Sequence, residues 1–229
     1  MRNEQLLERR QLTRLALFGW VLVLLFGGFV IKAPAQATSQ EKKPSVVSFF
    51  NAAVGSHPIF LDWGGQKAFP EGLKTGQSMG PLLVPSGSFP IRYQMEGFLD
   101  GQGKADALTE KICTFVFYSG PPLKDGKDAG KRPLKVFPIP PVSESESRKE
   151  YQWLVIYLGV TESVEIEANK QRVKLRNAEP VFLGKGERFF EITQAGKSLA
   201  SVTVDSPDNH IFVVYGDDPE SLSAGIVYR

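Results

Sequence analysis

An internal repeat constrains the fold of this chain more than any other sequence feature. The segments "KICTFVFYSG" (111–120) and "DNHIFVVYGD" (208–217) carry nearly the same pattern and align at an offset of 97. "GPLLVPSGSFPIRY" (80–93) matches "EPVFLGKGERFFEI" (179–192) without a gap at an offset of 99, and "IFLDWGGQ" matches "VEIEANKQ" at an offset of 105. Small insertions in loops account for the changing offset. The sequence therefore predicts two copies of one structural unit.

Each copy is rich in strand-like patterns. "FPIRYQME" (89–96) and "SVEIEA" (163–168) alternate apolar and polar side chains, which is the period of a half-buried strand. Gly-Gly at 64–65 and Asn-Lys at 169–170 follow strand-like segments and are candidate hairpin turns. Strands with one apolar face bury it by stacking two sheets. We predict an all-β chain with two tandem, sequence-related, small antiparallel β-sandwich (Ig-like) units after an N-terminal hydrophobic helix.

Changes in composition set the boundaries of these units. We place the first unit at 45–140 and the second at 151–229. Between them, "PVSESESRKE" (141–150) is predicted to be a polar linker, because its alternating Ser and Glu have nothing to bury. A spacer (38–44) precedes the first unit, and a leader occupies 1–37. Both a tandem arrangement and a mutually packed pair satisfy the pattern.

The leader indicates export. Four arginines precede the uncharged run "LALFGWVLVLLFGGFVI" (15–31). Such a run is short for a membrane span of about 20 residues and long for a signal-peptide core of about 7–15. The small-residue pattern Ala35-Gln36-Ala37 favours cleavage near Ala37, and the alternative is an inner-membrane anchor formed by 15–31. In both cases we expect the rest of the chain in the periplasm of a Gram-negative bacterium.

Charge and cysteine content narrow the class of protein. The whole chain has 27 basic and 25 acidic residues, and removing the five basic and two acidic residues of 1–37 leaves 22 and 23. The exported part therefore lacks the basic surplus that a nucleic-acid partner requires. Cys113 is the only cysteine, so the chain has no intrachain disulfide and depends on packing. Hydrophobic residues make up 42% of the chain, which is sufficient for packed cores.

One motif suggests catalysis. "GQSMG" (76–80) fits the G-x-S-x-G pattern of a serine hydrolase, and Asp205 or Asp208 and His210 follow in the order of a triad. That motif works on a strand-to-helix turn, whereas Pro81 and a strand-like segment follow here. We therefore favour an inter-strand loop and keep an esterase-like hydrolase using Ser78 as an alternative.

No metal or cofactor site is expected. "AGKS" (195–198) resembles the end of a phosphate-binding loop, but Glu191 stands where its first glycine is required. His57, His210 and Cys113 are far apart and lack ligand spacing. "DGQGKAD" (100–106) could hold calcium weakly, but we favour a solvated hairpin loop.

Aromatic residues offer a third possibility, polysaccharide binding. Trp63 beside Asp62 has the aromatic-plus-carboxylate composition of sugar-binding surfaces, which makes both of them candidate ligand-binding residues. Trp63 shares its alternation phase with Leu61, however, which favours a role in the core. Cys113 and Trp153 are likewise expected to be buried.

Several segments together carry a resemblance. The first unit opens with "VVSFFNAAVG" (46–55), contains a "VPSG" turn and a "TFVFYSG" strand, and leads through a Pro-Pro linker to "WLVIYLG" (153–159). This combination resembles secreted tandem β-sandwich repeat proteins of unknown function and, more specifically, is similar to periplasmic adaptor proteins of the alginate O-acetylation machinery. The second unit departs in lacking a counterpart of Asn51. The resemblance implies a non-catalytic role and carries over no site residues.

The combined prediction is an exported, non-catalytic binding or scaffolding protein without a cofactor. The resemblance implies partners among the periplasmic or membrane proteins of a polysaccharide-modification complex, an accessory role in exopolysaccharide (alginate-like) O-acetylation, and contact with the polysaccharide itself. The alternatives are the hydrolase using Ser78 and a polysaccharide-binding module.

Overall fold

A computed structural model describes residues 43–109, 111–143, 152–185, 188–204 and 209–228. These residues form strands and turns and contain no helix, so the all-β prediction is confirmed. The predicted leader, its hydrophobic helix and most of the spacer lie outside the described residues. Glu41–Arg229 forms one compact unit.

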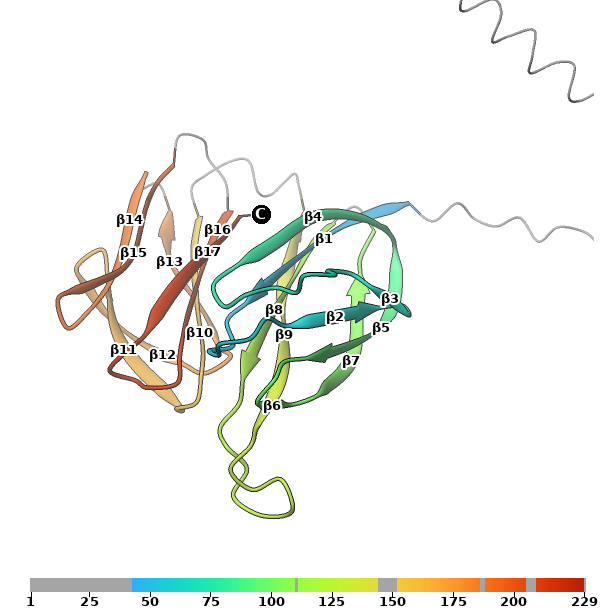
Figure 1. Ribbon diagram of the computed structural model, residues 1–229. Coiled ribbons are helices and arrows are strands. Elements are labelled where there is room, and N and C mark those ends of the chain that lie inside the picture. The colour runs from blue at the N-terminus through green and yellow to red at the C-terminus, as the bar shows by residue number, and fades with distance from the viewer. Residues whose placement is uncertain (1–42, 110, 144–151, 186–187, 205–208, 229) are drawn as a thin grey trace, which may run out of the picture. The chain divides into compact units, whose positions relative to one another are not determined.

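Two groups of strands follow one another along the chain (Figure 1). The first half contains β1 (Pro44–Asn51), β2 (Phe60–Trp63), β3 (Gln66–Lys67), β4 (Ser78–Pro85), β5 (Gly87–Gln94), β6 (Phe98–Leu99), β7 (Gly101–Ala107), β8 (Lys111–Ser119) and β9 (Arg132–Ser143). The second half contains β10 (Gln152–Gly159), β11 (Ser163–Ala168), β12 (Gln171–Arg176), β13 (Pro180–Lys185), β14 (Phe189–Gln194), β15 (Lys197–Thr203), β16 (Asn209–Gly216) and β17 (Ser223–Tyr228).

The strand orders of the two halves correspond one to one. In the first half the sheets run β4-β1-β8-β9-β6 and β3-β2-β5-β7, and in the second half they run β13-β10-β16-β17 and β12-β11-β14-β15. Only β6 has no counterpart among the described strands. Each half is thus a sandwich-like pair of sheets with the same order of strands.

The sheets differ from the purely antiparallel prediction. β1 pairs with β8 in parallel, and β10 pairs with β16 in parallel, while their other neighbours in the sheet are antiparallel. A parallel neighbour needs a crossover connection. Between β1 and β8 the chain crosses to the opposite sheet through β2 and β5, and between β10 and β16 it does so through β11 and β14.

Each half encloses its own core. Phe49 and Phe117 of one sheet pack with Leu61 and Ile91 of the other in the first half. The second half is built in the same way around Trp153, which is 1% exposed, so its predicted burial is confirmed. These side chains share one face of their strands, as the period of two predicts.

A third apolar cluster lies where the two halves meet, and we call it the seam. The seam joins the outer faces of the sheets that contain β1 and β10. A sheet covered on both faces needs apolar side chains at successive positions. This explains the uninterrupted apolar runs in β8 and β16. The buried seam residues are Phe50, Ala52, Val116, Ile139, Ile156, Leu158, Ile211, Val213, Tyr215 and Val227.

The two predicted hairpin turns are present. Gly64 and Gly65 join β2 to β3 with φ of 60° and 88°, and Asn169 and Lys170 join β11 to β12 with φ of 46° and 67°. Two positive φ angles in a two-residue hairpin define a type I′ turn. The same turn therefore occurs at equivalent places in both halves.

Three details correct the sequence-based interpretation. Residues 100–106 were expected to form a hairpin loop, but 101–106 belong to β7, which pairs along β5. β9 continues to Ser143, three residues into the predicted linker. The ladders pair Trp63 with Ile91 and its counterpart Ala168 with Ile192, which gives β5 and β14 an offset of 101 instead of 99. A two-residue slip keeps every side chain on its face, so alternation alone could not detect it.

Candidate functional site

An apolar crevice lies at the edge of the seam and is the best candidate for a binding site. It has a volume of about 290 Å³. Edge strand β4 forms one wall, β1 and β8 contribute the base, and β17 contributes one residue from the second half. The lining residues are Val46, Ser48, Ser78, Met79, Gly80, Pro81, Ile112 and Val227.

The wall formed by β4 depends on a close approach of two backbones. Gly80 has a φ of 120°, and a Cβ added there would lie 2.8 Å from the carbonyl oxygen of Val47 and 2.9 Å from the Ser48 hydroxyl. Both distances are below van der Waals contact, so glycine is required for β4 to lie this close to β1.

The chemistry of the crevice is uncharged. None of its lining residues carries an ionisable side chain, and the polar side chains among them are the hydroxyls of Ser48 and Ser78. Such a surface suits apolar groups, with the hydroxyls available for one or two hydrogen bonds. None of the described residues that line it is a base that could activate Ser78.

The apolar surface extends beyond the crevice along β4. Leu83 pairs with Val46 across the ladder and is 77% exposed. On the corresponding edge strand β13, Phe182 is 51% exposed. Natural edge strands usually carry charged or proline residues. β4 has Pro81 and Pro85, which remove backbone donors, so a partner would dock mainly on side chains.

Ser78 and His210, the two described residues of the predicted hydrolase, do not line the same crevice. Ser78 begins β4 at the crevice, in a strand with no helix after it. His210 is 4% exposed, and its ring stacks on Trp153 at a centroid distance of 4.8 Å, beside the core of the second half. His210 does not line the crevice. Asp205 and Asp208 lie outside the described residues.

The residues predicted for sugar binding have separate structural roles. The half-buried ring of Trp63 packs against Phe49 and Phe89, with centroid distances of 5.5 and 5.1 Å. The Asp62 carboxylate accepts a hydrogen bond from the Gly65 backbone N–H at 2.8 Å, which supports the hairpin turn. Successive strand residues point to opposite faces, so Asp62 and Trp63 do not form one surface.

Cys113 is buried, as predicted. It is 5% exposed in the core of the first half, and its Sγ accepts a hydrogen bond from the Leu108 backbone N–H at 3.3 Å. A second hollow of about 230 Å³ lies beside it, and Lys104 and Asp106 are among its lining residues. The Thr114 hydroxyl is also buried and has no hydrogen-bond partner among the described residues. His57, the predicted loop histidine, lies 3.3 Å from Glu96 on the surface.

An asparagine holds the strand end of each half, and it is buried in the first half and half-buried in the second. Asn51 ends β1; its side-chain amide donates to the Leu73 carbonyl at 2.7 Å, and its Oδ1 accepts from the Ala53 N–H at 2.9 Å. In the second half Asn177 donates to the Gly159 carbonyl at 2.8 Å, at the end of β10. A different segment therefore supplies the asparagine that is missing from the sequence position corresponding to Asn51.

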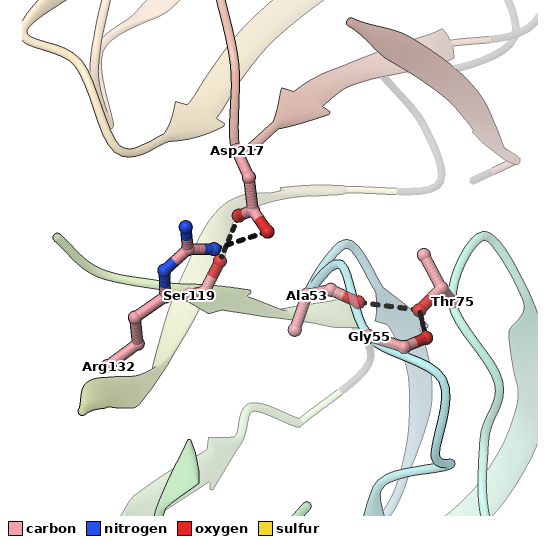
Figure 2. Close-up of polar contacts among 6 residues, drawn as sticks. All are labelled: Ala53, Gly55, Thr75, Ser119, Arg132 and Asp217. Carbon is pink, nitrogen blue, oxygen red and sulfur yellow. Dashed lines mark hydrogen bonds and ion pairs between the residues drawn. The ribbon is translucent and has the colours of Figure 1, made fainter. Parts of the chain in front are cut away.

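Polar contacts also join the two halves and tie down the adjacent loop (Figure 2). The carboxylate of Asp217, after β16, pairs with Arg132 of β9 and accepts a hydrogen bond from the Ser119 hydroxyl of β8 at 3.1 Å. The Thr75 hydroxyl, which precedes β4, donates to the carbonyl of Ala53 in the loop after β1 at 2.6 Å. The Asp217 contacts thus add a polar link between the two halves beside the apolar seam.

The described residues contain no cluster typical of a metal centre. No group of three or more His, Cys, Asp or Glu residues in the described ranges could hold a metal ion. Within the same ranges, no helix combines the length and apolarity required to cross a membrane. In comparisons with known proteins, no family model and no curated protein matches the chain.

Sequence reasoning missed the crevice and the seam. The signal for the seam was present, because Phe115, Val116 and Phe117 are successive apolar residues, and all three are buried. A half-exposed sheet would alternate at these positions. The crevice left no comparable signal, since its lining residues come from separate strands.

Proposed function

We propose that the chain is an exported, non-catalytic binding or scaffolding protein that uses the crevice and the neighbouring Leu83 to hold partner proteins. The observation that carries the proposal is the uncharged lining of the crevice beside an apolar residue that is 77% exposed. An exposed apolar patch is typical of protein interaction sites. We further propose that the halves are tandem Ig-like units preceded by the hydrophobic leader helix.

The resemblance noted in the sequence suggests the class of partner. We place those partners among the periplasmic or membrane proteins of an exopolysaccharide-modifying system, such as alginate O-acetylation. The predicted leader supports the compartment, because basic residues precede its apolar run. The burial of His210 and the separate roles of Asp62 and Trp63 support scaffolding over the hydrolase and the polysaccharide-binding alternatives.

Site-specific crosslinking in the producing cell tests this function. A photo-reactive amino acid replaces Leu83, and a matched control carries it at Gln102, an exposed position on β7 in the other sheet. We expect a discrete crosslinked protein product from position 83 and none from position 102. Equal products at both positions, or none at position 83, would contradict the proposal.

A second experiment separates scaffolding from catalysis. Leu83→Asp leaves Ser78 in place, whereas Ser78→Ala removes the nucleophile of the hydrolase alternative. In the crosslinking experiment, the photo-reactive group is moved to Pro81, and scaffolding predicts that Leu83→Asp abolishes the crosslinked product. Scaffolding also predicts that the purified protein has no ester-hydrolysis activity. An esterase activity that Ser78→Ala removes would establish the hydrolase instead.

A further inference from the structure

The seam uses the same positions from both halves. Aligning Tyr118 with Tyr215 makes Val116 equivalent to Val213. Val116 pairs with Phe50 and Val213 pairs with Ile156, so Phe50 and Ile156 are also equivalent. Thr114 likewise pairs with Ile139, and Ile211 pairs with Val227. The corresponding seam residues are Phe50 and Ile156, Ala52 and Leu158, Val116 and Val213, Tyr118 and Tyr215, and Ile139 and Val227.

The contacts across the seam also run crosswise. Phe50 of β1 meets Tyr215 of β16 at a ring-centroid distance of 5.8 Å, and β8 approaches β10. Because β1 corresponds to β10 and β8 to β16, the β1–β16 contact and the β10–β8 contact are equivalent contacts made in opposite directions. That reciprocity defines an isologous, two-fold interface.

We propose that the seam is an isologous dimer interface whose two protomers have become covalently joined, so that each half recognises the other without the linker. The bond between Ser119 and Asp217 fits this arrangement. These residues correspond to Gly216 and Gly120, so the contact joins nearly equivalent positions, as expected close to a two-fold axis.

The seam has diverged in a way that favours pairing of unlike halves. Phe50 lies over Gly225, where an added Cβ would be 2.3 Å from the ring. The residue corresponding to Gly225 in the first half is Phe137, because Val213 pairs with Gly225 and Val116 pairs with Phe137. Two first halves would thus bring Phe50 against Phe137, which lacks the space that Gly225 provides. Such a clash disfavours self-pairing.

Cleavage of the linker tests the proposal. A specific protease site is inserted between Ser147 and Arg148 of the exported part, which contains the whole compact unit Glu41–Arg229. The folded protein is then cut, and size-exclusion chromatography at micromolar concentration measures association. Trp63 and Trp153 report the two cores separately by fluorescence. We expect the halves to co-elute with both cores folded.

Matched substitutions test the reciprocity of the interface. Phe50→Ala and its counterpart Ile156→Ala should each raise the dissociation constant of the cut protein by about tenfold or more. Phe182→Ala, on an exposed edge position, should leave it unchanged. Separation or unfolding of the halves on cleavage, or an equal effect of Phe182→Ala, would overturn the proposal. A failure to crosslink at Leu83 would contradict the proposed function and leave the proposal about the seam unaffected.

Discussion

Gly225 shows how much the seam depends on a single missing side chain. A Cβ at this position would lie 2.3 Å from one ring carbon of Phe50 and 2.6 Å from another, and Phe50 is itself 1% exposed. Gly225→Ala should therefore reduce the free energy of unfolding by about 1–3 kcal/mol, the usual cost of overpacking. Chemical denaturation measures the change.

The matched control for this substitution is Gly103→Ala. Gly103 also lies in a strand, β7, and a Cβ added there meets nothing within 4 Å. We expect Gly103→Ala to change stability by less than about 0.5 kcal/mol. The double variant Phe50→Leu with Gly225→Ala should recover part of the loss. Equal destabilisation by the two glycine substitutions would contradict the close packing at the seam.

The tyrosines at the seam predict a response to alkaline pH. Burial raises the pKa of Tyr118 and Tyr215 above the ordinary phenol value of 10.0. The unfolded chain therefore loses these protons at lower pH than the folded protein does. The free energy of unfolding is unaffected below pH 10 and falls as the pH rises from 10 through the folded pKa.

Tyr215→Phe provides the measurement for this prediction. Phenylalanine keeps the ring that packs on Phe50 but cannot ionise. Thermal unfolding followed from neutral pH to above pH 10 should show a smaller loss of stability in Tyr215→Phe than in the native protein. Identical pH profiles would mean that the Tyr215 hydroxyl is not desolvated by the fold.

At the scale of elements, the two hairpin turns occupy equivalent places but carry different residues. Lys170 adopts a φ of 67° in the second half, where Gly65 occupies the equivalent place with a φ of 88°. A left-handed conformation is unfavourable for lysine and free of steric cost for glycine. Lys170→Gly should raise the free energy of unfolding by about 1 kcal/mol, and Gly65→Lys should lower it by about the same amount. Denaturant midpoints compare the variants, and changes of the same sign would contradict the shared turn type.

The sequence predicted the type of several elements but not which strands pair. Local chemistry predicted the hairpin turns, the burial of Trp153 and the strand nature of β5 and β8. It could not predict the parallel pairing of β1 with β8, because alternation specifies which face a residue occupies and not its neighbour. The offset of β5 and β14 was wrong by two residues for the same reason.

The candidate site was less predictable than the fold. Ser78 was recognised from its motif, but its place at an apolar crevice depends on β1, β8 and β17 meeting β4. The exposure of Leu83 could not be predicted, because a leucine between Leu82 and Val84 in a strand is ordinarily read as part of an apolar, buried segment. Its exposure follows from the edge position of β4, which only the sheet order reveals.

At the scale of the whole molecule, the seam should make the two halves unfold together. It buries Val116 and Ile139 from the first half and Val213 and Val227 from the second. Losing either half would expose the apolar face of the other, at a cost of roughly 25 cal/mol for each Å² of apolar surface. Calorimetry or denaturant unfolding should thus detect one cooperative transition.

Native-state hydrogen exchange tests this coupling most directly. The backbone amides of β8 and β16, which lie at the centre of their sheets, are compared as denaturant is added. If the seam joins the halves into one cooperative body, both sets of amides exchange through the same opening, with the free energy of global unfolding. If β16 instead exchanges through an opening of lower free energy while β8 stays protected, the halves are independent and the seam does not unite them.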